Sequence, residues 1–309
     1  MFICDAHCDT IERLLNNGEG LAENSGHLDM ARARDVGLEL QFFAAWIDPK
    51  YAPNCAERAT NIINKYHEEC AANMERIAKV RSGADMTRGK LNAVLTIEGG
   101  SALEGDMANL QRFWDMGVRL MTLTWNGSNE LSDGAVALDG EDDVRRGLTE
   151  FGREVVREMV KMGMIIDVSH LSERGFWDVL EETNGATPIF ATHSNCKKLA
   201  EHPRNLTDEQ IKTIIHTGGF IGLNFYPDFL GEKKKEDITR HAAHFLELGA
   251  EDSLGFGADF DGVDCLPNGI EGLESMGDYA RDLEREFGAK VAEKIAGENL
   301  WAITQKSLT

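Results

Sequence analysis

The chain has 309 residues, of which 42% are hydrophobic and 28% are charged, and this ordinary globular composition excludes a disordered or fibrous protein. Its 32 Lys and Arg residues against 53 Asp and Glu residues give a net charge of -21, which makes nucleic acid and anionic lipid unfavourable partners. A length of about 300 residues fits either two ordinary domains or one large α/β barrel, so the pattern along the chain has to decide.

Short apolar runs alternate with longer amphipathic segments from end to end of the chain. Eight of the runs are rich in Val, Ile, Leu and Phe, which is typical of strands buried on both faces of a parallel sheet. In chain order they are residues 2–7, 38–47, 91–98, 119–125, 164–170, 188–193, 219–226 and 253–259. Segments with helical spacing lie between them, among them residues 57–80, 144–162, 207–216 and 237–248. Thr207 and Gln210 also form a capping-box pattern at the start of the third of these segments.

The order of these segments favours one domain over residues 1–309. No Pro/Ser-rich linker, low-complexity tract or internal repeat divides the chain. Eight strand–helix units in series predict a (β/α)₈ TIM barrel, whose chemistry lies at the carboxyl ends of the strands. A doubly wound sheet, the alternative, more often has a Gly-rich turn after its first strand, and residues 5–9 (DAHCD) form no such turn.

The sequence also lacks segments that would direct the chain to a membrane. No apolar stretch approaches the roughly 18 residues of a membrane span, and the N-terminal residues MFICDAHCDT do not resemble a signal peptide. The six cysteines form no C-x-x-C pair, which is typical of thiols in a reducing compartment. We therefore expect a cytoplasmic protein with no membrane partner.

Side chains that can bind metals or protons lie at the carboxyl ends of five of the eight predicted strands. They are His7 and Asp9 after the first strand, Glu98 after the third, His170 after the fifth, His193 after the sixth and Asp259 after the eighth. Residues i and i+2 of a strand point to the same side, so His7 and Asp9 can both face the barrel mouth. Taken singly, each residue has an ordinary structural explanation. Three of the nine histidines at predicted strand ends, together with the acids, indicate a common site.

These residue types predict a metal site. Imidazole and carboxylate suit first-row metals, and zinc is the usual ion for such a mixture. A single catalytic zinc takes about three protein ligands, so five fit two ions better. If Glu98 bridges, one ion takes His7 and Asp9, and the other takes His170 and His193. A hydroxide between two ions is hydrolytic machinery.

An acid near the ions would move the protons of such a reaction. We expect Asp259 to be the general base that holds the hydroxide and passes its proton to the leaving nitrogen. Asp261 is the competing candidate, and Asp259 is favoured because it comes first after the strand.

The motifs around these residues resemble the membrane dipeptidase (renal dipeptidase) family of the amidohydrolase superfamily. The resemblance rests on the strings DAHCDT, TIEGG, RLMTLTWN, DVSHLS, FATHS, HPRNLTDEQI, GLNFYP and GADFDGV, and it extends to GENLWAI. It implies an amidohydrolase-like barrel that hydrolyses dipeptides with two zinc ions per chain, and it suggests a homodimer. It also implies that Glu98 bridges the zinc ions as described above and that Asp259 is the catalytic acid and base.

The resemblance also supplies substrate contacts. Arg204 in the string HPRN matches the arginine that pairs with the C-terminal carboxylate of the substrate, for which a guanidinium offers a bidentate grip. Tyr226, after the seventh predicted strand, is expected to line the same pocket.

One position departs from the family pattern. Many relatives carry a histidine after the Thr-Leu-Thr of the fourth predicted strand, where this chain has Trp125. An indole N–H donates one hydrogen bond but cannot carry charge or move a proton. The stabilisation of the oxyanion is therefore expected to fall to Asn126 or to the metals, and Trp125 to shape the pocket.

Two alternatives have to be weighed against a dipeptidase. Another binuclear amidohydrolase would act on a non-peptide amide or an ester, but most of those begin with His-x-His and often bridge their metals with a lysine, where this chain has His-x-Asp and Glu98. A barrel that binds metal or peptide without catalysis is indicated only by Trp125. The presence of all five ligand residues together with Asp259 argues against it.

Overall fold

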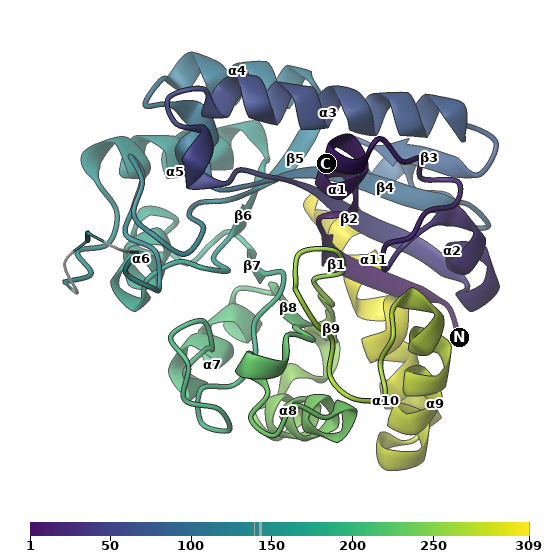
Figure 1. Ribbon diagram of the computed structural model, residues 1–309. Coiled ribbons are helices and arrows are strands. Elements are labelled where there is room, and N and C mark those ends of the chain that lie inside the picture. Colours follow the sequence, from purple (N-terminus) through teal and green to yellow (C-terminus); the bar gives the residue numbers. More distant parts are fainter. Residues whose placement is uncertain (139, 142–143, 309) are drawn as a thin grey trace.

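The computed structural model describes residues 1–138, 140–141 and 144–308, and its strands form a closed parallel ring surrounded by helices (Figure 1). The ring consists of β1 (Ile3–Cys8), β2 (Leu38–Trp46), β4 (Leu91–Glu98), β5 (Val118–Thr122), β6 (Ile165–Asp167), β7 (Ile189–Ala191), β8 (Phe220–Leu223) and β9 (Leu254–Phe256). Each strand pairs in parallel with the next, and β9 pairs with β1. The predicted (β/α)₈ TIM barrel is confirmed.

All eight predicted runs contain a strand of the ring, but five of these strands end about three residues earlier than predicted. The predicted strand 164–170 ends at Asp167, and the predicted strand 253–259 ends at Phe256. His170 and Asp259, which follow them, have φ angles of 66° each. A strand cannot continue through the left-handed region, so the chain turns where these side chains leave the sheet.

The structure contains one strand that was not predicted, and two predicted helices are shorter than expected. The predicted helix 57–80 is α3 (Cys55–Ala72) followed by the short strand β3 (Ile77–Val80). β3 pairs with residues 91–94 of β4, and β5 pairs with residues 95–98 of the same strand. The predicted helix 144–162 begins later, as α5 (Glu150–Met162), because the Thr149 side chain accepts a hydrogen bond from the Gly152 N–H and so caps the helix.

The remaining helices lie around the ring. They are α1 (Thr10–Asn17), α2 (Met30–Val36), α4 (Met107–Asp115), α6 (Glu173–Glu182), α7 (Asp208–His216), α8 (Lys235–Glu247), α9 (Met276–Phe287), α10 (Ala289–Glu293) and α11 (Asn299–Ser307). The predicted capping box at the start of α7 is present, since Thr207 Oγ1 accepts from the Gln210 N–H and Gln210 Oε1 accepts from the Thr207 N–H. Among the described residues, no helix has the length and apolar character needed to cross a bilayer.

Apolar packing closes the amino-terminal end of the barrel. A small core cluster joins Leu40, Val94, Leu120 and Phe190 of the strands to Leu300 of α11. A much larger cluster fills the space between the strands and the outer helices. The carboxyl ends of the strands are therefore the end at which polar side chains gather.

Candidate metal centre

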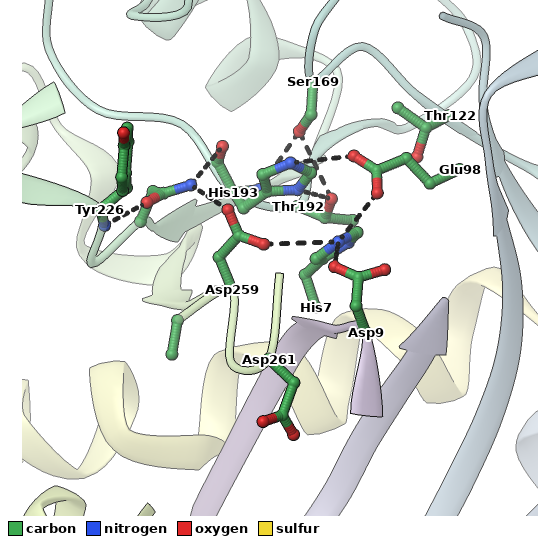
Figure 2. Close-up of polar contacts among 12 residues, drawn as sticks. His7, Asp9, Glu98, Thr122, Ser169, Thr192, His193, Tyr226, Asp259 and Asp261 are labelled. Atoms are coloured by element: carbon green, nitrogen blue, oxygen red, sulfur yellow. Dashed lines mark hydrogen bonds and ion pairs between the residues drawn. The ribbon is translucent and has the colours of Figure 1, made fainter. Parts of the chain in front are cut away.

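The five predicted metal ligands meet at the carboxyl ends of the strands, where Figure 2 shows His7, Asp9, Glu98 and His193 pointing toward one another. His7 is the penultimate residue of β1, and Glu98 is the last residue of β4. His170 and His193 follow β6 and β7 by three and two residues. All five side chains are buried, so they form a cluster of polar groups that water hardly reaches.

Glu98 lies at the centre of the cluster and divides it in two. Its Oε2 atom is 3.4 Å from His7 Nε2, which is itself 3.4 Å from Asp9 Oδ2. Its Oε1 atom is 2.8 Å from His170 Nε2 and 3.4 Å from His193 Nε2. The two oxygens of Glu98 thus face different side chains, Oε2 toward His7 and Oε1 toward His170 and His193, as a carboxylate that bridges two ions would.

The hydrogen bonds behind the histidines fix which nitrogen carries the proton. Thr192 Oγ1 donates to Asp167 Oδ2 at 2.7 Å, so it accepts from His193 Nδ1, which is 2.9 Å away. His170 Nδ1 lies 2.9 Å from the side-chain amide oxygen Oδ1 of Asn126 and donates to it. In both rings the proton is therefore on Nδ1, and Nε2 presents a lone pair to the cluster.

These lone pairs oppose one another unless a cation lies between them. The Nε2 atoms of His170 and His193 are 2.9 Å apart, and both face the Glu98 carboxylate. In addition, His7 Nε2 and Asp9 Oδ1 are buried without a hydrogen-bond partner among the described residues. Buried polar atoms are rarely left unpaired. The donor set therefore fits one or more divalent ions of the kind that imidazole and carboxylate bind.

Burial and neighbouring charges shift the pKa values of the cluster in different directions. Burial raises the pKa of Asp9 to about 8, and the neighbouring charges of Glu98 and Asp259 add to the rise against the opposing effect of His7. Burial also lowers the pKa of His170 to about 3, which keeps its imidazole neutral and able to act as a ligand.

Two buried carboxylates that the sequence analysis did not single out hold the cluster in place. Asp167 accepts hydrogen bonds from the hydroxyls of Thr122 and Thr192, each at 2.7 Å. Asp5 accepts from the His7 N–H at 3.1 Å and from Gln41 Nε2 at 2.8 Å. Their positions in the strings DAHCD and DVSH, two or three residues before a predicted ligand, were the available signal.

Of the two acids after β9, only Asp259 faces the cluster. Its Oδ1 atom is 3.8 Å from His7 Nε2, and its Oδ2 atom accepts a hydrogen bond from Asn224 at 3.0 Å. Asp261 is turned away in Figure 2 and accepts from Thr10 Oγ1 at 2.6 Å and from the His27 N–H at 2.7 Å. The geometry therefore gives Asp261 a structural task between β9 and the chain around His27.

A cavity of about 440 Å³ opens over the cluster, which is a suitable volume for a small ligand. Its walls include the predicted residues Trp125 and Tyr226, and also Trp46 and Phe229, which the sequence analysis did not predict. Trp125 packs edge-to-face on Trp46 at 5.3 Å, and Tyr226 packs the same way on Phe229 at 4.9 Å. Two aromatic pairs therefore form part of the cavity wall.

Arg204 is buried close behind the cluster. Its Nη2 atom donates to the carbonyl oxygen of His193 at 3.2 Å, and its Nε–H has no partner among the described residues. Burial lowers its pKa to about 10, so the guanidinium remains charged at neutral pH. Arg204 lines a second cavity, of about 460 Å³, beside the one that opens over the cluster.

Comparisons with known proteins agree on one family. A model of the membrane dipeptidase family (Peptidase family M19) matches residues 1–307. An uncharacterized dipeptidase of Schizosaccharomyces pombe is 33% identical over 230 residues, which are 72% of this chain and 55% of the yeast protein. The chain thus spans about half the length of that relative.

Two solved structures superpose on nearly the whole chain. One is a dipeptidase AC, described as a metallopeptidase of family M19, with 27% identity, a TM-score of 0.92 and coverage of 100% of this chain and 99% of that one. The other is a metallopeptidase from Rhodobacter sphaeroides, crystallised with a phosphinate mimic of the dipeptide L-Ala-D-Ala. It has 26% identity, a TM-score of 0.91 and coverage of 99% of both chains.

Proposed function

Because this chain belongs to the membrane dipeptidase family, Peptidase family M19, we propose that it is a metal-dependent dipeptidase that hydrolyses the peptide bond of dipeptides. One observation carries the proposal: the Nε2 lone pairs of His170 and His193 converge on the Glu98 carboxylate at the floor of a cavity. Converging lone pairs and a carboxylate are stabilised when they bind a cation. Because the group lies at the cavity, a small substrate can reach that cation.

The metals of the proposal are two zinc ions per chain. His7 and Asp9 would hold one, His170 and His193 the other, and Glu98 would bridge them. When bound, such ions supply a water of lowered pKa as the nucleophile and polarise the carbonyl of the scissile bond. The chain's own contribution is to hold the ligands in a fixed orientation, through Thr192 and Asn126 behind the histidines.

Asp259 is the proton carrier of the proposal. Its Oδ2 atom is held by Asn224, which leaves Oδ1 directed at the cluster. Burial raises the pKa of this carboxyl, so it accepts a proton more readily than a solvent-exposed aspartate. Asp259 Oδ1 would take the proton of the attacking water and deliver it to the leaving nitrogen, so the same atom acts first as base and then as acid.

The remaining proposed residues hold the substrate. A guanidinium has five N–H groups, and Arg204 uses two of its donors on His193 and Ser194. The others are free to bind the C-terminal carboxylate of the dipeptide. Trp125 and Tyr226 would form walls beside its side chains.

Metal removal combined with a substrate panel tests the function. Dialysis against a chelator should abolish dipeptide hydrolysis, and zinc should restore it at two ions per chain by elemental analysis, since the nucleophile depends on the ions. The panel should include an ester, a lactone and a cyclic amide beside dipeptides. Full activity in metal-free protein, or turnover of the non-peptide substrates alone, would contradict the proposal.

A further inference from the structure

A third cavity borders the cavity over the metal cluster. Its volume is about 360 Å³, and it lies between the segments that follow β2, β4 and β5. Part of its wall is apolar and consists of Ile47, Pro49, Ala52, Pro53 and Cys55. Of these residues, Ile47 and Cys55 are buried. The third cavity therefore offers a space that suits an apolar group of a small ligand.

Trp125 forms the boundary between these two cavities. Among the described residues it alone lines both, so at this point the cavities are separated by the width of a single residue. The cavity over the cluster also includes Glu98 and His170, two of the predicted metal ligands. A group that passed the position of Trp125 would therefore enter the third cavity from the place where the peptide bond is proposed to be cleaved.

Neighbouring groups hold Trp125 in this position. Its ring packs edge-to-face on Trp46 at 5.3 Å, and its centroid lies 6.2 Å from that of the His170 ring. The residues on either side of it are tied to the segment after β6, since Thr124 Oγ1 donates to the carbonyl oxygen of His170 at 3.1 Å and Asn126 Oδ1 accepts from His170 Nδ1 at 2.9 Å. A ligand would have to break these contacts to displace the ring.

The charges of the two cavities indicate which end of a dipeptide lies near Trp125. Both linings contain carboxylates, and among the described residues neither contains a Lys or an Arg. The third cavity contributes Glu104 and Glu130, and the cavity over the cluster contributes Glu12 and Asp264 besides the residues of the metal centre. Carboxylates repel the C-terminal carboxylate of a dipeptide and attract its ammonium group. The N-terminal residue is therefore the one that suits the space beside Trp125.

We propose that Trp125 limits the size of the N-terminal side chain that the enzyme accepts, because its ring closes the third cavity to the substrate. This inference rests on the proposed dipeptidase activity, and it narrows the substrate class to dipeptides with a small N-terminal side chain. A smaller residue at position 125 would join the two cavities. A large apolar side chain would then extend into the third cavity, against Ile47 and Cys55.

The test compares the dipeptides Ala-Ala, Trp-Ala and Ala-Trp in the wild type and in Trp125→Ala. We expect the substitution to raise kcat/KM for Trp-Ala relative to Ala-Ala by about tenfold or more, which is the scale on which the size of a pocket discriminates between side chains. The ratio of Ala-Trp to Ala-Ala should stay at its wild-type value. An unchanged Trp-Ala ratio, or an equal gain for Ala-Trp, would overturn the inference.

Two further variants support this comparison. Trp125→Phe keeps a ring against Trp46, so it should give a smaller gain for Trp-Ala, and it replaces Trp125→Ala in the test if that variant does not fold. Trp301→Ala is the matched control for the loss of an indole ring. Trp301 packs on Phe2 at 5.9 Å, against the core cluster at the amino-terminal end of the barrel, so both ratios should stay at their wild-type values.

Binding without hydrolysis separates this inference from the proposed function. Tryptophanamide and alaninamide carry the ammonium group of an N-terminal residue but no carboxylate. In calorimetric titrations of the zinc-loaded protein, Trp125→Ala should bind tryptophanamide more tightly than the wild type does, by about tenfold or more, and alaninamide with unchanged affinity. Dipeptide hydrolysis with an unchanged affinity for tryptophanamide would overturn the inference and leave the proposed function intact. Absence of all dipeptide hydrolysis would overturn the proposed function, and the titration would then decide on the third cavity alone.

Discussion

Gly262 leaves room for two of the carboxylates at the metal centre, and its substitution by Ala tests the geometry directly. A Cβ atom at this position would lie 2.2 Å from Asp9 Oδ2 and 2.5 Å from Asp259 Oδ1, where ordinary contact begins at 3.4 Å. One or both carboxylates would therefore have to move by about 1 Å. A misplacement of that size at a reacting centre reduces the rate by about a hundredfold.

The assay for Gly262→Ala is steady-state hydrolysis of a dipeptide together with the zinc content of the purified protein. We expect kcat/KM to fall by about a hundredfold, and zinc content to fall if Asp9 is the carboxylate that moves. Gly277→Ala is the control, because the nearest atom to its added Cβ would be the end of the Arg281 side chain at 3.9 Å. Wild-type kcat/KM and full zinc content in Gly262→Ala would refute the placement of both carboxylates.

Three further substitutions test the separate roles proposed for the site. Asp259→Asn should lower kcat by about a hundredfold or more while zinc content stays near normal, since it removes a proton carrier and no predicted ligand; wild-type turnover would show that Asp259 is not the proton carrier. Arg204→Ala should weaken transition-state binding of free dipeptides by about 2 to 5 kcal/mol, and that of C-terminally amidated dipeptides much less. Equal losses in kcat/KM for both substrate types would show that Arg204 serves only the fold. Trp125→Ala should change KM and side-chain preference more than kcat, because the ring is a wall of the cavity. A uniform hundredfold fall in kcat would instead make the indole N–H an oxyanion donor, since that is about the effect of losing one.

The barrel fold and the gathering of the predicted ligands at one site could both be predicted from the sequence. Both follow from the positions of the eight buried strands along the chain. Once eight buried strands run in parallel, every residue at a carboxyl end lies at one mouth, so His7 and Glu98 are brought together although 90 residues separate them in the chain. No pattern marked β3, because Ile77 and Val80 are three residues apart and this spacing equally suits the end of a helix.

Side-chain direction was beyond the reach of sequence reasoning. Asp5 and Asp167 precede ligands in strands, and a carboxylate that braces a site has the same local sequence as one that binds a metal. Asp259 and Asp261 were separable only by their hydrogen-bond partners, which come from distant segments. The cavity beside Arg204 likewise depends on three connections between strands and helices, whose paths no periodicity predicts.

The closure of the ring between β1 and β9 has a consequence for the order of events in folding. The Asp259 N–H donates to the carbonyl oxygen of His7 at 3.2 Å, so the first and last strands meet at the site itself. A ribosome-bound chain that has emerged only as far as β5 carries His7, Asp9 and Glu98 but lacks both later histidines. The last predicted ligand, His193, follows β7, so all five ligands are present only once six of the eight ring strands have been synthesised, and Asp259 joins them when β9 closes the ring.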